Sequence, residues 1–335
     1  MTDRAELAKA FIAGTEWKNA DRSLLAGDAS NRRYDRLTRT ETGETAVFMD
    51  APPEKGEDIR PFVKIARHLK ENGLSAPEII ATDEENGFLI LEDLGDDLYS
   101  RVIAKNPPLE EELYGAAVDV LIDLHKAPLP ALDAYDAALM TDLAGLAFSE
   151  YADRINGASD PQVAERFAGQ FNTILRDVEP DNPVLVQRDY HADNLLWLPD
   201  RTGVARVGLL DFQDAMSGHP AYDLVSLLQD IRRDVSPGVE AKMIAHYIDE
   251  TGVQDHAFRK AYAVLGAQRN LRILGVFARL GTTYGKPRYI DMIPKVWEVL
   301  TRDLEHPALA PVADLLLTNL PRPTPENLAL LRAEQ

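Results

Sequence analysis

The spacing of apolar residues near the start of the chain predicts a small sheet. After an opening helix, two β-rich runs, residues 34–39 and 45–49, flank a polar stretch in which Gly43 suits a hairpin turn. Two further short apolar runs, residues 79–80 and 88–91, are separated by turn residues. The first ninety-odd residues are therefore expected to be mostly strands.

Helical periodicity predicts one helix inside the β-rich segment and helices over most of the sequence that follows it. Within the β-rich segment it occurs over residues 62–69, and Gly73 then suits a left-handed helix cap. From about residue 110 most segments have helical period, and residues 113–124 form one apolar stripe. The exception is the segment 184–211, which contains three strand-like runs.

These elements predict an α+β, two-lobed fold with a β-rich N-terminal lobe and a mainly α-helical C-terminal lobe. We place the hinge at residues 92–95, where an apolar strand gives way to a polar stretch. The expected lobes are residues 1–94 and residues 95–335; the resemblance described below implies that the first binds nucleotide and the second holds the catalytic and substrate-binding groups.

The composition narrows the classes of partner and compartment. The 335 residues include 36 Lys and Arg against 55 Asp and Glu, a formal charge of −19. Such a charge repels nucleic-acid phosphates and anionic membranes, so we expect a small-molecule substrate, with neither nucleic acid nor membrane as partner. Without cysteine or an apolar N-terminal stretch, the protein is expected to be cytoplasmic.

One predicted hairpin carries the residues with the clearest chemistry. If residues 195–198 pair antiparallel with residues 204–210, Asn194 and Asp211 emerge side by side at one end. An amide oxygen and a carboxylate suit Mg²⁺, which takes one or two carboxylates together with substrate phosphates. Asp189, earlier in the same loop, could orient an attacking hydroxyl and accept its proton. The pattern is typical of phosphoryl transfer.

Two other interpretations of this loop stay open. Asp189, Asp193 and Asn194 are residue types that commonly cap turns. His191 alternates with Asp189 and Asp193, a pattern that could also bind the metal of a metallophosphohydrolase, although the other histidines lack paired spacing. If the loop serves phosphoryl transfer, His191 instead holds the loop in place.

Motifs in this region resemble a known enzyme family. The stretches Gln-Arg-Asp-Tyr-His-Ala-Asp-Asn-Leu-Leu-Trp (187–197) and Leu-Leu-Asp-Phe-Gln-Asp-Ala (209–215) resemble the aminoglycoside phosphotransferase/choline kinase group of protein-kinase-like enzymes. The resemblance covers nearly the whole chain. Residues 49–54, 60–63 and 268–279 are similar to the anomeric sugar kinases, which phosphorylate N-acetylmuramate and N-acetylglucosamine at C1 in peptidoglycan recycling.

The resemblance implies roles for several residues and two cofactors, ATP and Mg²⁺. Asp189 would be the catalytic base, and Asn194 and Asp211 would be the Mg²⁺ ligands. The hinge whose backbone meets adenine would be formed by Glu92, Asp93 and Leu94.

The sequence departs from the kinase pattern on a strand. Kinases have Val-Ala-Ile-Lys on their third strand, but residues 46–50 read Ala-Val-Phe-Met-Asp and lack the lysine that pairs with phosphate. Lys55 or an arginine could substitute for it.

The glycine-rich loop is also reduced, with Gly27 as its single glycine. Gly27, Ser30 and Asn31 could still present N–H groups and a hydroxyl to phosphate, with charge from Arg32 or Arg33. A surface turn is the alternative.

Residues that could bind the acceptor lie further along the chain. Arg269 and Arg272 stand among apolar residues and could bind an acidic sugar substituent, with a solvated helix face as the alternative. Asp214 could bond sugar hydroxyls. Asp223 opens an apolar helix, and we expect it to accept backbone N–H bonds, either from its own first turn or from the catalytic loop.

The function expected from these residues is ATP-dependent phosphorylation of the anomeric hydroxyl of an N-acetylated amino sugar. One alternative is a kinase of an aminoglycoside, choline or another amino alcohol. Another is a nucleotide-binding regulator without catalysis, because the strand lysine is missing. The sequence leaves open the acceptor, the anomeric preference, the replacement for the lysine, the choice of ATP or GTP, and the oligomeric state.

Overall fold

The chain folds into two units, as seen in a computed structural model that describes residues 4–26, 31–158 and 160–333. Unit 1 comprises Met1–Ala127 and Ala192–Ala215, and unit 2 comprises Pro128–His191 and Met216–Gln335. A segment from the middle of the sequence therefore belongs to the same unit as the N-terminal sheet.

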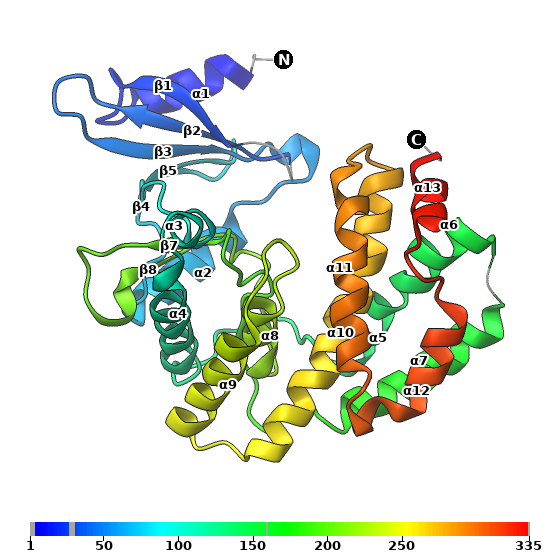
Figure 1. Cartoon of the computed structure of the whole chain (residues 1–335). Coiled ribbons are helices and arrows are strands. Elements are labelled where there is room, and N and C mark those ends of the chain that lie inside the picture. The colour runs from blue at the N-terminus through cyan, green and yellow to red at the C-terminus, as the bar shows by residue number, and fades with distance from the viewer. Residues whose placement is uncertain (1–3, 27–30, 159, 334–335) are drawn as a thin grey trace. The chain divides into compact units, whose positions relative to one another are not determined.

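The described residues of unit 1 form an antiparallel five-stranded sheet in the order β1-β2-β3-β5-β4 (Figure 1). The strands are β1 (Asp21–Ala26), β2 (Arg33–Thr38), β3 (Thr45–Asp50), β4 (Ile79–Asp83) and β5 (Phe88–Glu92). The expected hairpin is confirmed, since β2 and β3 pair from Arg33↔Asp50 to Thr38↔Thr45. Gly43 takes φ 75° in the turn between them, a conformation that favours glycine.

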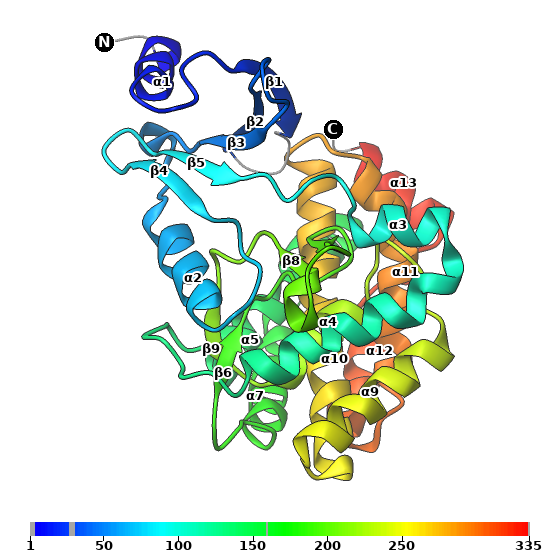
Figure 2. The same cartoon turned by 90° about the vertical axis from the view of Figure 1, so that its left-hand side faces the viewer.

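Helix α1 (Arg4–Ala13) covers one face of this sheet (Figure 1, Figure 2). Its residues Ala8 and Ile12 are buried in a cluster with Leu37, Phe48 and Phe88. Because side chains alternate across a strand, every second residue of β2 and β3 can reach this face. The small sheet thus gains a core of its own.

Three helices and a second hairpin complete unit 1. They are α2 (Arg60–Glu71), α3 (Tyr99–Lys105), α4 (Glu110–Leu124), β7 (Leu195–Trp197) and β8 (Val207–Leu209). The expected antiparallel pairing of this hairpin is confirmed, with Leu195 opposite Leu209. The second strand is shorter than the expected residues 204–210, because Gly203–Arg206 form a 3-10 turn before it begins.

Unit 2 is mainly helical in its described residues. It contains α5 (Ala137–Ala144), a π-helical turn (Ala147–Ala152), α6 (Asp153–Asn156), α7 (Pro161–Arg176), β6 (Val184–Val186), β9 (Met216–Gly218), α8 (Ala221–Leu228), α9 (Pro237–Thr251), α10 (Asp255–Thr282), α11 (Arg288–Asp303), α12 (Ala310–Asn319) and α13 (Pro325–Ala333). Helices α10 and α11 lie side by side (Figure 1, Figure 2). A Cβ on Gly275 of α10 would lie 2.4 Å from the Leu146 backbone, so this helix approaches the π-helical turn closely.

The expected fold class is confirmed, since an N-terminal sheet is followed by a mostly helical remainder. The units divide the chain differently from the lobes expected at residues 1–94 and 95–335. Residues 95–127 and 192–215 group with the N-terminal sheet, because the β7–β8 hairpin bonds to the segment that follows it. None of the described helices is long and apolar enough to cross a membrane.

Candidate active site

The β7–β8 hairpin brings Asn194 and Asp211 together. Asn194 directly precedes β7, and its carbonyl oxygen accepts a hydrogen bond from the Leu210 N–H at 3.0 Å, which extends the pairing beyond β8. The Asn194 Nδ2 atom lies 3.4 Å from Oδ2 of Asp211. The expected convergence of these two side chains at one end of the hairpin is therefore observed within unit 1.

Asp211 has a strained backbone. It takes φ 59°, in the left-handed region that non-glycine residues rarely adopt. The next residue, Phe212, is fully buried and stacks on Phe62 of α2, with ring centroids 4.9 Å apart. Gln213 donates to Oδ1 of Asp211 at 2.8 Å. The turn thus buries the phenylalanine while it leaves the Asp211 side chain exposed, and strain of this kind clusters at functional sites.

The chemistry of this pair fits Mg²⁺ with substrate phosphates as further ligands. Among the described residues there is no group of three or more histidine and acidic side chains that could hold a metal ion. An amide oxygen and one carboxylate leave most positions to water and phosphate, as Mg²⁺ prefers. Asn194 and Asp211 are therefore suitable ligands for a metal that arrives with a nucleotide.

The expected hinge is tied to the same hairpin by an arginine. Arg201 donates from NH2 to Oε1 of Glu92 at 2.6 Å, and from NH1 to Oγ of Ser75 at 2.7 Å. Ser75 in turn donates to the Ala205 carbonyl at 2.7 Å. A Cβ on Gly208 of β8 would lie 3.1 Å from Leu94, which is itself buried. The turn of the hairpin thus packs and bonds against the hinge.

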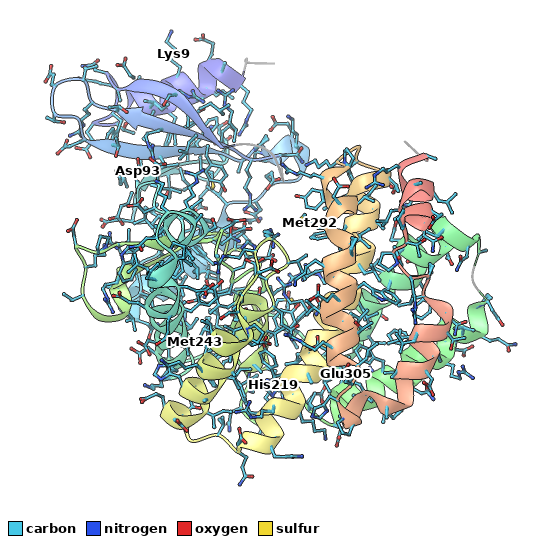
Figure 3. All side chains as sticks on the ribbon, in the orientation of Figure 1. Lys9, Asp93, His219, Met243, Met292 and Glu305 are labelled. Carbon is cyan, nitrogen blue, oxygen red and sulfur yellow. The ribbon has the colours of Figure 1, made fainter. Side chains whose placement is uncertain are left out.

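A second arginine holds the other side of the hinge. Arg36 of β2 bonds both oxygens of Asp93, at 2.6 and 3.1 Å, and both oxygens of Asp96, at 2.9 and 3.0 Å. Asp93 also accepts a bond from the Gly95 N–H at 2.9 Å, and Gly95 takes φ 88°. Figure 3 shows Asp93 just beyond the sheet, on the side of α3. The carboxylates of Glu92 and Asp93 are therefore engaged by arginines, and the Glu92 N–H donates to the Glu78 carbonyl at 2.8 Å.

Of the expected phosphate loop, Gly27 and Ser30 lie outside the described residues. The Asn31 N–H donates to Glu57 at 3.1 Å, and its side chain donates to the Lys55 carbonyl at 3.2 Å. Arg32 pairs with Glu57 at 2.7 Å. The end of this loop is thus fastened to the segment after β3.

The position of the missing strand lysine lies near the end of β3. Met49 is fully buried, and Asp50 forms an ion pair with Arg4 of α1 at 2.6 Å. Lys55 is exposed and follows β3 in a 3-10 turn. Asp50 therefore forms a structural contact with α1. Lys55 or an arginine stays the predicted replacement for the missing strand lysine.

Asp189 lies in unit 2, on a loop that a buried carboxylate holds. Asp223 of α8 is fully buried and accepts from the N–H groups of Gln187, at 2.6 Å, and Arg188, at 2.9 Å. Arg188 takes φ 73°. Ser226, one turn further along α8, donates to the Arg188 carbonyl at 3.2 Å. Of the two expected partners of Asp223, its own first turn and the loop before Asp189, the structure shows the loop.

The surroundings of Asp189 favour its ionised form. Burial alone would raise the pKa of this half-buried carboxyl, but the positive charges of Arg272 and Arg269 outweigh burial, and its pKa is lower than usual. Burial lowers the pKa of the neighbouring His191 to about 3, assisted by Arg232. Asp189 is therefore a carboxylate beside a neutral imidazole at physiological pH.

The residues expected to bind the acceptor differ in their burial and in their neighbours. Arg269 of α10 is only 3% exposed and donates to Oγ of Ser226 at 2.8 Å. Arg272, one turn later, is half-buried and lies near Tyr222 of α8. Asp214 is exposed and belongs to unit 1 with Asn194 and Asp211.

Sequence reasoning missed the partners that hold these groups. Arg36, Arg201, Ser226 and Tyr222 were not identified, because they act on residues far from them in the sequence. The Arg201–Glu92 contact, for example, spans 109 positions. The sequence contains no local signal for such a pair.

Comparisons with known proteins identify the family of the chain. Residues 21–262 match the phosphotransferase enzyme family. The chain is 41% identical to an N-acetylmuramate/N-acetylglucosamine kinase of Caulobacter vibrioides, over 92% of this chain and 95% of that protein. It is 35% identical to a kinase of the same name from Pseudomonas aeruginosa, over 87% of this chain and 86% of that protein.

Solved structures share the fold at low sequence identity. An ethanolamine kinase of Plasmodium vivax gives a TM-score of 0.64 at 14% identity, and it covers 90% of this chain and 88% of its own. A choline kinase of Streptococcus pneumoniae gives a TM-score of 0.60 at 16% identity, and it covers 91% of this chain and 98% of its own. The expected protein-kinase-like fold is thereby confirmed, and the family match shows that the chain belongs to the phosphotransferase enzyme family.

Proposed function

We propose that this phosphotransferase transfers the γ-phosphoryl group of ATP to the anomeric hydroxyl of N-acetylmuramate and N-acetylglucosamine. The names of the relatives support this acceptor class. The observation that carries the chemistry is the pairing of Asn194 with a backbone-strained Asp211 at one end of a hairpin. ATP is an intracellular donor, so we expect the activity in the cytoplasm.

The proposed reaction is a direct transfer. A bond forms between the acceptor oxygen and the γ-phosphorus while the bond from that phosphorus to the β,γ-bridging oxygen breaks, which gives a sugar 1-phosphate and ADP. Asp189 orients the hydroxyl and takes its proton. The lowered pKa of Asp189 supports this role, because an ionised carboxylate can accept a hydrogen bond from the hydroxyl.

The donor side of the proposed site lies within unit 1. We expect the backbone of residues 92–94 to meet adenine and the loop that ends at Asn31 to meet the phosphates. Asn194 and Asp211 would hold Mg²⁺, which neutralises charge on the β and γ oxygens when bound. Fixed contacts of Glu92 and Asp93 with arginines support a preformed hinge. The roles of Gly27 and Ser30 stay predictions.

ADP release tests the proposal directly. The full chain is incubated with ATP, Mg²⁺ and one acceptor at a time: N-acetylmuramate, N-acetylglucosamine, choline or an aminoglycoside. We expect release with the two N-acetylated sugars and a product that is phosphorylated at C1. Release only with choline or the aminoglycoside would refute the acceptor class, and ATP consumption that needs no acceptor would refute the transfer.

The role of the base is tested with Asp189→Asn. We expect nucleotide affinity to stay near that of the wild type while turnover falls about 10²–10⁴-fold, the usual contribution of general base catalysis. Asp181→Asn is a matched control, because Asp181 is exposed and precedes β6 in the same unit. Normal turnover in Asp189→Asn would exclude the role.

A further inference from the structure

Two helices of unit 2 meet through a pair of polar contacts. Arg269 and Arg272 stand three positions apart on α10, and Tyr222 and Ser226 stand four positions apart on α8, so each pair lies on one helix face. Arg269 bonds Ser226, and Arg272, one turn further along the same face, lies near Tyr222. The two arginines therefore occupy neighbouring positions in the same interface.

The inner contact is closed to ligands. Arg269 is 3% exposed and Ser226 is 0% exposed. Ser226 joins this arginine to the Arg188 carbonyl, directly before Asp189. An acceptor could not reach the Arg269 guanidinium without opening the core, so this side chain is suited to holding the loop.

The second arginine, Arg272, is only half-buried, and the neighbouring Tyr222 is held firmly. Tyr222 shares a hydrogen bond of 3.1 Å with Tyr135, and the two rings meet edge to face at 5.0 Å. The Arg188 guanidinium lies over the Tyr135 ring at 5.3 Å. Arg272 thus lies beside a fixed tyrosine pair, and its planar guanidinium has donors that can bind a carboxylate.

The charge around Asp189 is locally positive, against the trend of the chain. The full sequence carries −19, yet Arg188, Arg269 and Arg272 all act on Asp189. The nearby carboxylate of Asp223 is occupied by two backbone N–H groups. Such a region attracts an anionic acceptor and repels a cationic one, since both would approach a surface with excess positive charge.

We propose that Arg272 binds the carboxylate of the acidic acceptor N-acetylmuramate, whereas Arg269 is a positioning residue that no acceptor touches. N-acetylmuramate differs from N-acetylglucosamine by a lactyl ether that ends in a carboxylate, so one guanidinium can add affinity for the first sugar alone. This inference rests on the proposed function. It assigns separate roles to Arg269 and Arg272, for which the sequence predicted the same role.

Kinetics on both sugars test the assignment. In Arg272→Gln of the full chain, we expect kcat/KM for N-acetylmuramate to fall about 10- to 100-fold, the value of one charged hydrogen bond, through a higher KM. The value for N-acetylglucosamine should change less than about threefold, because the neutral sugar lacks the partner. Arg272→Lys should recover part of the loss. Arg259→Gln is the control, since Arg259 is exposed on α10 and bonds only Asp255 in the contacts described.

Arg269→Gln should behave differently. It should lower kcat on both sugars alike and leave the two KM values near those of the wild type, because the loop that carries Asp189 is displaced while acceptor binding is kept. Equal losses on both sugars in Arg272→Gln, or no loss at all, would overturn the assignment of Arg272. A wild-type enzyme that phosphorylates neither sugar would instead refute the proposed function, and this inference with it.

Discussion

The contact between Arg201 and Glu92 gives the sharpest test of how the donor side is assembled. It joins the turn of the β7–β8 hairpin to the hinge, across 109 positions of sequence. The hairpin carries Asn194 and Asp211 at its other end. If the contact fixes the hairpin relative to the hinge, its loss should weaken nucleotide binding as well as folding.

The size of the effect follows from exposure and geometry. The two side chains are 34% and 30% exposed and meet at 2.6 Å, so the ion pair should contribute about 0.5–1 kcal/mol, as a well-formed but solvent-screened pair does. Arg201 also donates to Ser75 at 2.7 Å, which adds about 1 kcal/mol. We therefore expect Arg201→Gln to lower the free energy of unfolding by about 1.5–2 kcal/mol.

The assay is a double-mutant cycle of Arg201→Gln, Glu92→Gln and the double variant, followed by denaturant unfolding and by the KM for ATP. The KM should rise by up to about tenfold in Arg201→Gln, since 1.4 kcal/mol corresponds to a factor of ten. Arg206→Gln is the matched control, because Arg206 lies in the same turn and meets Glu112 at a longer 3.5 Å. A coupling energy of zero, with an unchanged KM for ATP, would refute the reasoning.

Three further predictions follow from burial and charge. Because nearby arginines lower the pKa of Asp189, we expect kcat/KM to show no loss from protonation of this base above the usual pKa of a carboxyl. An acid limb near pH 6 that is lost only in Asp189→Asn would contradict its role. Burial raises the pKa of Asp303 to about 7, so the unfolded chain ionises first and wild-type stability should fall as pH rises from about 4 to 7. In Asp303→Asn that slope should be shallower in urea unfolding followed at several pH values, and an unchanged slope would contradict it. Gly275→Ala should destabilise the protein by about 2 kcal/mol or more, because a Cβ at this position would lie 2.4 Å from the Leu146 backbone. A melting temperature equal to that of the wild type would contradict this prediction.

The hairpin with Asn194 and Asp211 could be predicted from the sequence because its information is local. Two apolar runs, a turn between them and polar residues at the outer ends define which side chains converge once the strands pair. The structure shortens the second strand to Val207–Leu209 and keeps the register. The same holds for the β2–β3 hairpin and for the apolar stripe of α4, which is buried, although α4 also buries Tyr114, Val118 and Ile122 outside the stripe.

The supports of the site could not be predicted, because each joins distant segments. Arg36 reaches Asp93 across 57 positions, and Ser226 reaches Arg188 across 38. Helical periodicity also failed to separate Arg269 from Arg272. Helix α10 packs against neighbours on several sides, so spacing along the helix does not indicate which arginine is enclosed.

By itself the sequence determined the change from a strand-rich to a helical part, the family, and the acidic and amide side chains expected to perform phosphoryl transfer. Only the tertiary structure decided that the hairpin with Asn194 and Asp211 groups with the N-terminal sheet, that Asp223 holds the backbone before Asp189, and that one arginine of α10 is enclosed while its neighbour is half-buried. The physical reason is that pairing within a hairpin or a helix depends on residues a few positions apart. Burial and charge at a site depend instead on segments that meet only after the whole chain has folded.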